Sequence, residues 1–444
     1  MTAFLASGDA AYWEHLPIGW SAAYCAPFVL MLLSIAVLPL LAPHWWHKSR
    51  NQAIVAALFG LPIALVFVFK DPLKLGHTAL EYAAFITLLA SLFIISGGIF
   101  VRGALAGTPL VNTAFLLIGG VLANFVGTTG AAMLLIRPLL RANRRRRNKT
   151  HIFIFFIFIV ANCGGCLTPL GDPPLYLGFL KGVPFEWTLR MWPMWATMVG
   201  ALLVIFNLLD QYKFNKEDVE TKGSLVEDVQ PGAARISLDG KRNIPLLVGI
   251  VGSIVGSGLL VKKGIATETQ SAFVQIAAMG TLAMLSMSIT PKRIREENEF
   301  TFYPIKEVAI LFAGIFAAMV PALLILNAKA GGFGLDRPWH FYLAAGSLSS
   351  LLDNAPTYLV FLEVARGSGF PSEAAGTSNV VLMAISLGSV FMGANTYIGN
   401  GPNFMVKSIV ESADVKMPSF FGYMAWSAAV LWPLLAVVAF VFLR

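Results

Sequence analysis

The stretch GGCLTPLGDPP at residues 164–174 decides the fold, because it interrupts an apolar segment that runs from 151 to 180. Proline has no backbone N–H and cannot continue a helix, so these residues predict a helix that is broken at its centre. A second stretch of this kind, GANTYIGNGP at 393–402, interrupts the segment 378–410. Irregular backbone within a bilayer is tolerated only where protein buries it or a watery cavity lines it. Two such breaks are therefore typical of a binding site inside a membrane protein.

The composition indicates the class of protein. The chain has 444 residues, of which 57% are hydrophobic and 13% are charged, whereas soluble domains have about 25% charged residues. This excludes a soluble enzyme, a nucleic-acid-binding module and a disordered protein, and it predicts a polytopic protein of the lipid bilayer. The net charge of +8 comes from short basic runs between apolar segments, which are typical of membrane topology signals. The N-terminal residues show no signal-peptide pattern.

Apolar segments of two lengths occur along the chain. Eight are suited to one membrane span of about 17–25 residues, and they lie near 19–43, 53–69, 79–101, 191–209, 244–261, 272–289, 303–326 and 420–443. Two others, 110–140 and 340–366, are too long, because about 30 helical residues reach about 45 Å and the hydrocarbon core is about 30 Å thick. Their centres read NFVGTTG (124–130) and LDNAPT (352–357). We expect both to be re-entrant hairpins.

The two halves of the chain repeat. A shift of 228 residues places Gly165, Thr168, Gly171 and Pro174 on Gly393, Thr396, Gly399 and Pro402. We therefore predict an all-α polytopic membrane protein with a first repeat at 1–210, a cytoplasmic polar linker at 211–243 and a second repeat at 244–444. Each repeat has four unbroken spans, one broken span and one hairpin that does not cross, so it crosses the membrane five times. This odd number inverts the second repeat, as in secondary transporters. The basic run at 141–149 is expected to be cytoplasmic, which places the N-terminus outside.

Two acids fall at predicted mid-membrane breaks, Asp172 in GDPP and Asp353 at the second hairpin tip. A carboxylate at mid-bilayer costs about 2.5–3.5 kcal/mol or more, so it persists only when it is paired, hydrated or bound to a cation. Asp172 is interpreted as a Na⁺ ligand or proton carrier, and Asp353, Asn354 and Thr357 as oxygen ligands for a hard cation. The alternative for both acids is capping of a half-helix. Na⁺ is predicted at Asp172, Asp353 and Asn354.

Neutral polar residues crowd the other breaks. They form the predicted substrate or ion site with the two acids, and they are Asn124, Thr128, Thr129, Thr168, Asn395, Thr396 and Asn400. Asn400 stands where Asp172 stands in the first half, which suggests that one half titrates while the other stays neutral. Cys163 and Cys166 lie inside a break with no nearby histidine, so we interpret them as small packing residues rather than as a redox or zinc motif. Glu81 and Glu307 are interpreted as scaffold-pairing acids.

Three phrases resemble the ion transporter superfamily: LTPLGDPPLYLG (167–178), LLDNAPTYL (351–359) and GANTYIGNGPNF (393–404). This group includes arsenite permeases, NhaD-type sodium/proton antiporters, citrate transporters and dicarboxylate/sodium symporters. The resemblance spans nearly the whole chain and is nearest to bacterial sodium/proton antiporters and citrate transporters. It implies a homodimer of the bacterial inner membrane in which a transport domain slides as an elevator against a scaffold. It also implies that ions and substrate bind between the hairpin tips and the breaks.

The chain departs from the superfamily pattern in two places. Its first hairpin has NFVGTT where an acid-containing tip is expected, and it lacks the Ser-Asn-Thr triplets of the dicarboxylate branch. The leading hypothesis is sodium (or other cation)/proton antiport, because two acids with no basic residue beside them favour a bound cation. The alternative is cation-coupled transport of citrate, another carboxylate or an oxyanion, because half-helix N-termini can hold an anion. We expect neither enzyme activity nor a cofactor beyond Na⁺ and H⁺.

Overall fold

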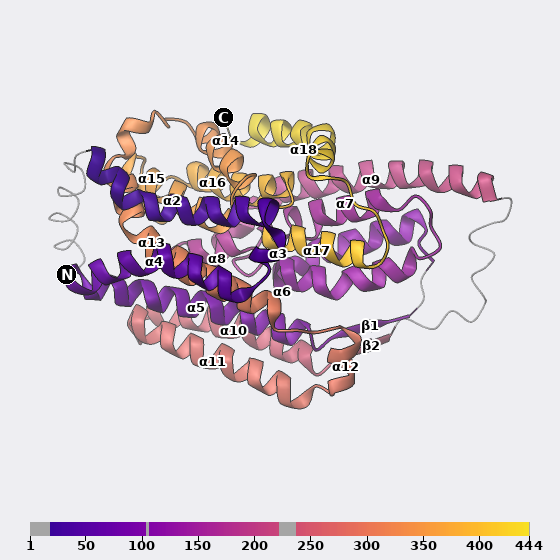
Figure 1. Ribbon diagram of the computed structural model, residues 1–444, viewed down its shortest axis with the longest axis horizontal. Coiled ribbons are helices and arrows are strands. Elements are labelled where there is room, and N and C mark those ends of the chain that lie inside the picture. The colour runs from indigo at the N-terminus through magenta and orange to yellow at the C-terminus, as the bar shows by residue number, and fades with distance from the viewer. Residues whose placement is uncertain (1–17, 104–105, 222–236, 444) are drawn as a thin grey trace.

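The computed structural model describes residues 18–103, 106–221 and 237–443, and in this part of the chain nearly all of the structure is helical (Figure 1). Nine of the described helices are long and apolar enough to cross a membrane. The one sheet in the described ranges pairs β1 (Phe100–Arg102) with β2 (Ser237–Asp239). The predicted class, an all-α polytopic membrane protein, is confirmed.

The eight single spans predicted from hydropathy are all helices. They are α2 (Ile18–Leu41), α4 (Ser49–Lys70), α5 (Pro72–Ser96), α9 (Trp192–Thr221), α10 (Asn243–Lys262), α11 (Glu268–Ile289), α13 (Tyr303–Ala328) and α18 (Phe420–Phe442). Short helices connect them: α3 (Pro43–Trp46), η2 (Phe185–Met191), α12 (Lys292–Glu297) and η3 (Ala330–Phe333). The helix α5 begins earlier than predicted because Asp71 caps it, accepting a hydrogen bond from the Lys74 N–H at 2.9 Å. Such a cap satisfies a backbone donor that the first helical turn leaves unpaired.

The segment predicted as a polar linker, 211–243, is partly helical. Helix α9 continues to Thr221, beyond the point where its apolar run stops, because acidic residues on this last part pair with the first hairpin, as described below. Residues 222–236 of this segment lie outside the described residues, as do residues 1–17, so the predicted side for the N-terminus stays a prediction. The strand β2 then leads into α10.

The first predicted hairpin is formed by α6 (Pro109–Ala142), which folds back on itself at Gly127. This residue has φ +76°, a left-handed conformation that glycine adopts without steric cost. The two ends of the segment lie side by side, since the Asn112 and Asn143 side chains exchange hydrogen bonds of 3.0 and 2.7 Å. The segment therefore enters and leaves at the same end of the molecule, as a re-entrant hairpin does.

The second predicted hairpin is formed by α14 (Pro338–Ser349) and α15 (Asn354–Gly367). The Phe341 ring, near the start of α14, packs against the Phe370 ring just beyond α15, with centroids 5.6 Å apart. The two ends of this segment are therefore also adjacent. The turn between the helices contains Asp353, which places this acid at the hairpin tip.

Both broken spans are divided into two half-helices with a short 3₁₀ turn between them. The first comprises α7 (Thr150–Ile159), η1 (Cys163–Cys166) and α8 (Pro173–Leu180); the second comprises α16 (Asn379–Met392), η4 (Gly393–Asn395) and α17 (Gly401–Ser412). In the first break a Cβ on Gly171 would lie 2.0 Å from the Gly165 carbonyl oxygen, and in the second a Cβ on Gly399 would lie 2.6 Å from the Gly393 oxygen. The repeated glycines are therefore required by the same close crossing of backbone in both halves.

The hairpins open at opposite ends of the molecule. At one end, the base of α6 is near the start of α7, where the Thr150 hydroxyl donates to the Lys416 carbonyl just beyond α17. At the other end, Arg366 on α15 donates to the Lys181 carbonyl at the end of α8. The broken spans thus run between the two ends in opposite directions, as an inverted repeat requires. Which end faces the cytoplasm stays a prediction from the basic run.

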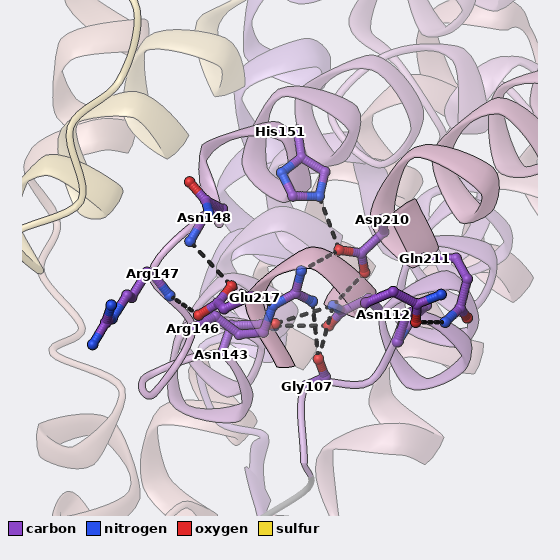
Figure 2. Close-up of polar contacts among 12 residues, drawn as sticks. Gly107, Asn112, Asn143, Arg146, Arg147, Asn148, His151, Asp210, Gln211 and Glu217 are labelled. Carbon is purple, nitrogen blue, oxygen red and sulfur yellow. Dashed lines mark hydrogen bonds and ion pairs between the residues drawn. The ribbon is translucent and has the colours of Figure 1, made fainter. Parts of the chain in front are cut away.

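A buried ionic network holds the base of the first hairpin (Figure 2). Arg146 donates to Asp210 on α9 at 2.7 Å and to the Gly107 carbonyl at 3.1 Å, and its side chain is 3% exposed. Asp210 also contacts Asn112 of the hairpin and His151 of α7, each at 2.9 Å. The basic run at 141–149 is thus more than a topology signal, and the run of arginines itself does not show which side chain faces inward.

Candidate functional site

All four irregular segments meet at the carboxylate of Asp172. This residue precedes α8 in the first broken span and is 1% exposed. Its Oδ1 accepts hydrogen bonds from the Thr128 hydroxyl of the first hairpin at 2.9 Å and from the Asn400 amide of the second break at 3.1 Å. Its Oδ2 accepts from the Asn354 amide of the second hairpin at 2.5 Å. The structure therefore brings together four predicted site residues that lie far apart in the sequence.

The donors around Asp172 are all neutral. Among the described residues, neither Asp172 nor Asp353 forms an ion pair with a lysine, arginine or histidine. Hydroxyl and amide donors stabilise a carboxylate but do not cancel its charge, and a buried charge that is not cancelled is costly. The arrangement can therefore accept a cation or a proton at Asp172.

Asp353 occupies the N-cap position of α15. Its Oδ1 accepts the backbone N–H of Ala355 at 3.0 Å, so the capping role considered from the sequence is present in the structure. Its side chain is half-buried, and the cap engages one of the two carboxylate oxygens. Thr357 is buried but donates to the Asp353 carbonyl within its own helix, at 2.9 Å. Thr129 is half-buried, and it is not among the three donors to the Asp172 carboxylate.

Two buried amide oxygens are available as ligands near the second hairpin tip. Within the described residues, Oδ1 of Asn354 and Oδ1 of Asn395 have no hydrogen-bond partner. Asn354 is fully buried, and its amide nitrogen is already directed at Asp172. Amide and carboxylate oxygens are the ligands that hard cations prefer. The Asp172 carboxylate and Oδ1 of Asn354 are thus ligands of the type that such a cation needs. The Na⁺ site at Asp172, Asp353 and Asn354 stays a prediction.

The first hairpin tip is joined to the first break by Asn124 and Thr168. The Asn124 amide donates to the Gly164 carbonyl at 2.7 Å, and its Oδ1 accepts the Leu167 N–H at 2.8 Å. The Thr168 hydroxyl donates to the Asn124 carbonyl at 2.5 Å. These bonds satisfy backbone groups that the broken helix leaves free, so both residues shape the site without touching Asp172.

The second hairpin repeats this junction through a residue that sequence reasoning missed, Ser350. Its hydroxyl donates to the Met392 carbonyl at 3.1 Å and accepts from the Asn395 amide at 2.9 Å. The Thr396 hydroxyl donates to the Ser350 carbonyl at 2.6 Å. Ser350 is therefore the counterpart of Asn124. A shift of 226 residues places Asn124 on Ser350, and the same shift places Glu81 on Glu307.

The same shift places Gly127 on Asp353 and Thr128 on Asn354. The first hairpin thus has a glycine where the second has an acid, which accounts for the missing acid noted in the sequence. The direct bond between Asp172 and Asn400 joins two residues related by the repeat. The site is therefore pseudo-symmetric in its backbone and asymmetric in its charge, as predicted from the sequence.

The remaining residues singled out from the sequence lie away from Asp172 or make no polar contact with it. Cys163 and Cys166 are buried, free thiols in η1. In the described part of the chain, no group of three histidine, cysteine or acidic residues is arranged to hold a metal ion. Glu81 pairs with Lys181 at 2.8 Å, and Glu307 accepts from Gln52 at 2.6 Å.

Discontinuous helices that meet hairpin tips around a buried carboxylate are the architecture of a secondary membrane transporter. A family model described as "Putative citrate transport" matches residues 18–443, so the chain belongs to this family. Membership supports a multi-pass membrane transporter rather than an enzyme. No curated protein matches the chain.

Proposed function

We propose that the protein is a secondary active transporter that carries citrate or a similar carboxylate together with a cation bound at Asp172. The observation that carries this proposal is the convergence of both hairpins and both breaks on one buried carboxylate with neutral donors only. The family to which the chain belongs supports a carboxylate as the substrate. The alternative reading from the sequence thus has more support than the antiport reading.

An anionic substrate needs positive potential, and the half-helices provide it. Three of them begin at the site: α8 follows Asp172, α15 follows Asp353 and α17 follows Asn400. The N-terminus of a helix carries a partial positive charge that favours anions. The two acids would repel a citrate anion, and a co-bound cation would remove this repulsion. Coupling between cation and substrate follows from this arrangement.

The test is uptake of radiolabelled citrate by proteoliposomes that contain the purified full-length protein. We expect accumulation when a Na⁺ or a proton gradient is imposed, and at least about a tenfold loss of cation stimulation in Asp172→Asn, since an amide cannot replace a charged ligand. The matched control is Glu307→Gln, which neutralises a half-buried acid outside the site and should retain stimulation. Citrate uptake that does not depend on either gradient, or wild-type cation stimulation in Asp172→Asn, would refute the proposal.

Sodium/proton antiport is the second candidate, and the neutral surroundings of Asp172 and Asp353 favour it. In that case Na⁺ and H⁺ would compete for one carboxylate, and no organic substrate would be required. The same proteoliposomes loaded with a pH-sensitive dye distinguish the two. Proton movement after a Na⁺ or Li⁺ pulse without citrate, lost in Asp172→Asn, would support antiport over citrate transport.

We propose that the protein is a homodimer in which each subunit undergoes an elevator movement. The hairpins and broken spans of a subunit would move together with its helices α9 and α18. The Arg146 network joins the first hairpin to α9. The Tyr342 hydroxyl of α14 donates to the Leu435 carbonyl of α18, and the Tyr423 hydroxyl of α18 donates to the Ala394 carbonyl of the second break. The Glu81–Lys181 pair, by contrast, connects α5 of the expected scaffold to α8. This pair must separate if α8 moves.

Paired cysteines at Glu81 and Lys181 test this movement. In Glu81→Cys/Lys181→Cys, a bifunctional thiol reagent with a reducible linker should abolish citrate uptake and reduction should restore it, because the linker spans the gap that the two long side chains fill and would hold α5 to α8. The native Cys25 is half-buried and would be replaced by alanine in this background. Full uptake in the cross-linked protein would contradict the elevator proposal.

A further inference from the structure

Behind Asp172 lies a chain of three asparagine side chains. Asn162 stands in the first break, directly before η1, Asn400 stands in the second break, and Asn403 lies in the first turn of α17. Asn162 and Asn403 are 0% exposed and Asn400 is 2% exposed. Only Asn400 contacts Asp172, so the other two have no direct role at the carboxylate.

The hydrogen bonds give this chain a direction. The Asn403 amide nitrogen faces two backbone carbonyls, Gly393 at 2.8 Å and Thr396 at 2.9 Å. A carbonyl oxygen only accepts hydrogen bonds, so Oδ1 of Asn403 must point the other way. It accepts from the Asn162 amide at 2.7 Å, which also donates to the Ile157 carbonyl at 2.8 Å.

The next link connects the chain to the carboxylate. Oδ1 of Asn162 accepts from the Asn400 amide at 3.1 Å, and the same amide nitrogen lies 3.1 Å from Oδ1 of Asp172. The Ala161 carbonyl, 3.2 Å away, also accepts from Asn400. Each amide is thus held in one orientation by backbone carbonyls in or next to a helix break, and the chain ties the two breaks together.

We propose that Asn162 and Asn403 are positioning residues, which hold the second break against the first so that the Asn400 amide and the Asp172 carboxylate are pre-arranged for the coupling cation. This inference rests on the proposed function, in which Asp172 binds that cation. A site arranged before binding has a higher affinity, because binding does not have to supply the free energy of ordering. Without the chain, the cation itself would have to order the two breaks.

The test uses Asn162→Leu, Asn403→Leu and the double variant of the full-length protein. Leucine has a similar size and cannot form the hydrogen bonds. Cation binding is measured from the rise in the thermal unfolding midpoint as NaCl, LiCl or MgCl₂ replaces choline chloride, which depends on ligand concentration relative to Kd. We expect about a tenfold higher half-saturating concentration in each single variant. The double variant should be no worse than the more affected single variant, because both changes interrupt one chain.

The transport measurement distinguishes positioning from general structural damage. In proteoliposomes, the cation concentration for half-maximal citrate uptake should rise in the Asn162 and Asn403 variants, while KM for citrate at saturating cation stays near the wild-type value. The control is Asn243→Leu, which removes a fully buried asparagine bonded to Gly98 and Thr290 away from the breaks. It should lower stability without changing the half-saturating cation concentration.

The outcomes separate this inference from the proposed substrate. Unchanged cation half-saturation in both single variants, or additive effects in the double variant, would overturn it even if citrate is transported. No cation response in the wild-type protein would also overturn it, because no coupling cation would then bind at Asp172. A tenfold loss of cation affinity in a protein that does not transport citrate would support the positioning role and refute the substrate.

Discussion

Replacing Arg146 with methionine should destabilise the protein by about 3 kcal/mol, the lower end of the cost of removing one partner from a buried ion pair. The Arg146 side chain is 3% exposed and its partner Asp210 is 0% exposed. Methionine retains much of the aliphatic packing but leaves the charge of Asp210 without its arginine. The lower end of the range applies because Asp210 keeps its contacts with His151 and Asn112.

The measurement is the thermal unfolding midpoint of the detergent-purified protein. With an unfolding entropy of about 2.1 cal/mol/K per residue over 444 residues, a loss of about 3 kcal/mol corresponds to a fall of about 3 °C. The matched control is Arg144→Met, which removes an exposed arginine from the same basic run. This variant should lie close to the wild-type protein, since exposed charges contribute about 0–1 kcal/mol.

A double variant tests the physical reason for the loss. In Arg146→Met/Asp210→Asn, the charge that Arg146→Met leaves unpaired is also removed, so the midpoint should recover part of the loss. Equal midpoints for Arg146→Met and Arg144→Met would show that the buried pair does not hold the hairpin base. If the double variant loses as much stability as Arg146→Met and Asp210→Asn lose together, the two residues are independent and the pairing is refuted.

Two other substitutions test the breaks with a neighbouring residue as the control. Gly399→Ala should prevent stable folding, because its Cβ would lie 2.6 Å from a buried carbonyl oxygen, whereas Gly401→Ala has no atom within 4 Å and should be tolerated; monodispersity and yield on size-exclusion chromatography report both. Thr128→Val removes a hydroxyl donor to Asp172, so the cation concentration for half-maximal uptake should change by about tenfold or more. Thr129→Val should behave as wild type, and equal effects of the two threonine variants would contradict the assigned site.

Hydropathy and length were sufficient to predict the spans and the hairpins. A segment such as 110–140 has more residues than one crossing needs, and its glycine-containing centre allows it to turn back at Gly127. These are local properties, since the cost of leaving backbone groups unpaired in a bilayer depends on the segment itself. The boundary at Thr221 was not predictable in this way, because α9 is extended by pairing with a distant arginine.

The candidate site was predicted as a set of residues and not as a set of contacts. The scarcity of acids in apolar segments drew attention to Asp172, and the repeat drew attention to Asn400. Neither feature shows that the two side chains bond directly or that Asn354 completes the arrangement. The shift of 228 residues that aligns the breaks places Asn124 on Leu352, so it does not identify Ser350 as the counterpart of Asn124.

The sequence by itself determined the class of protein, its spans and breaks, and the two acids at the breaks, because each follows from the cost of polar groups in an apolar environment. Only the tertiary structure decided which polar groups meet. Asn162, Asn403 and Arg146 are ordinary polar residues in the sequence, and they become significant because the fold buries them where each needs a partner. Such pairing depends on segments tens to hundreds of residues apart, so no local sequence pattern predicts it.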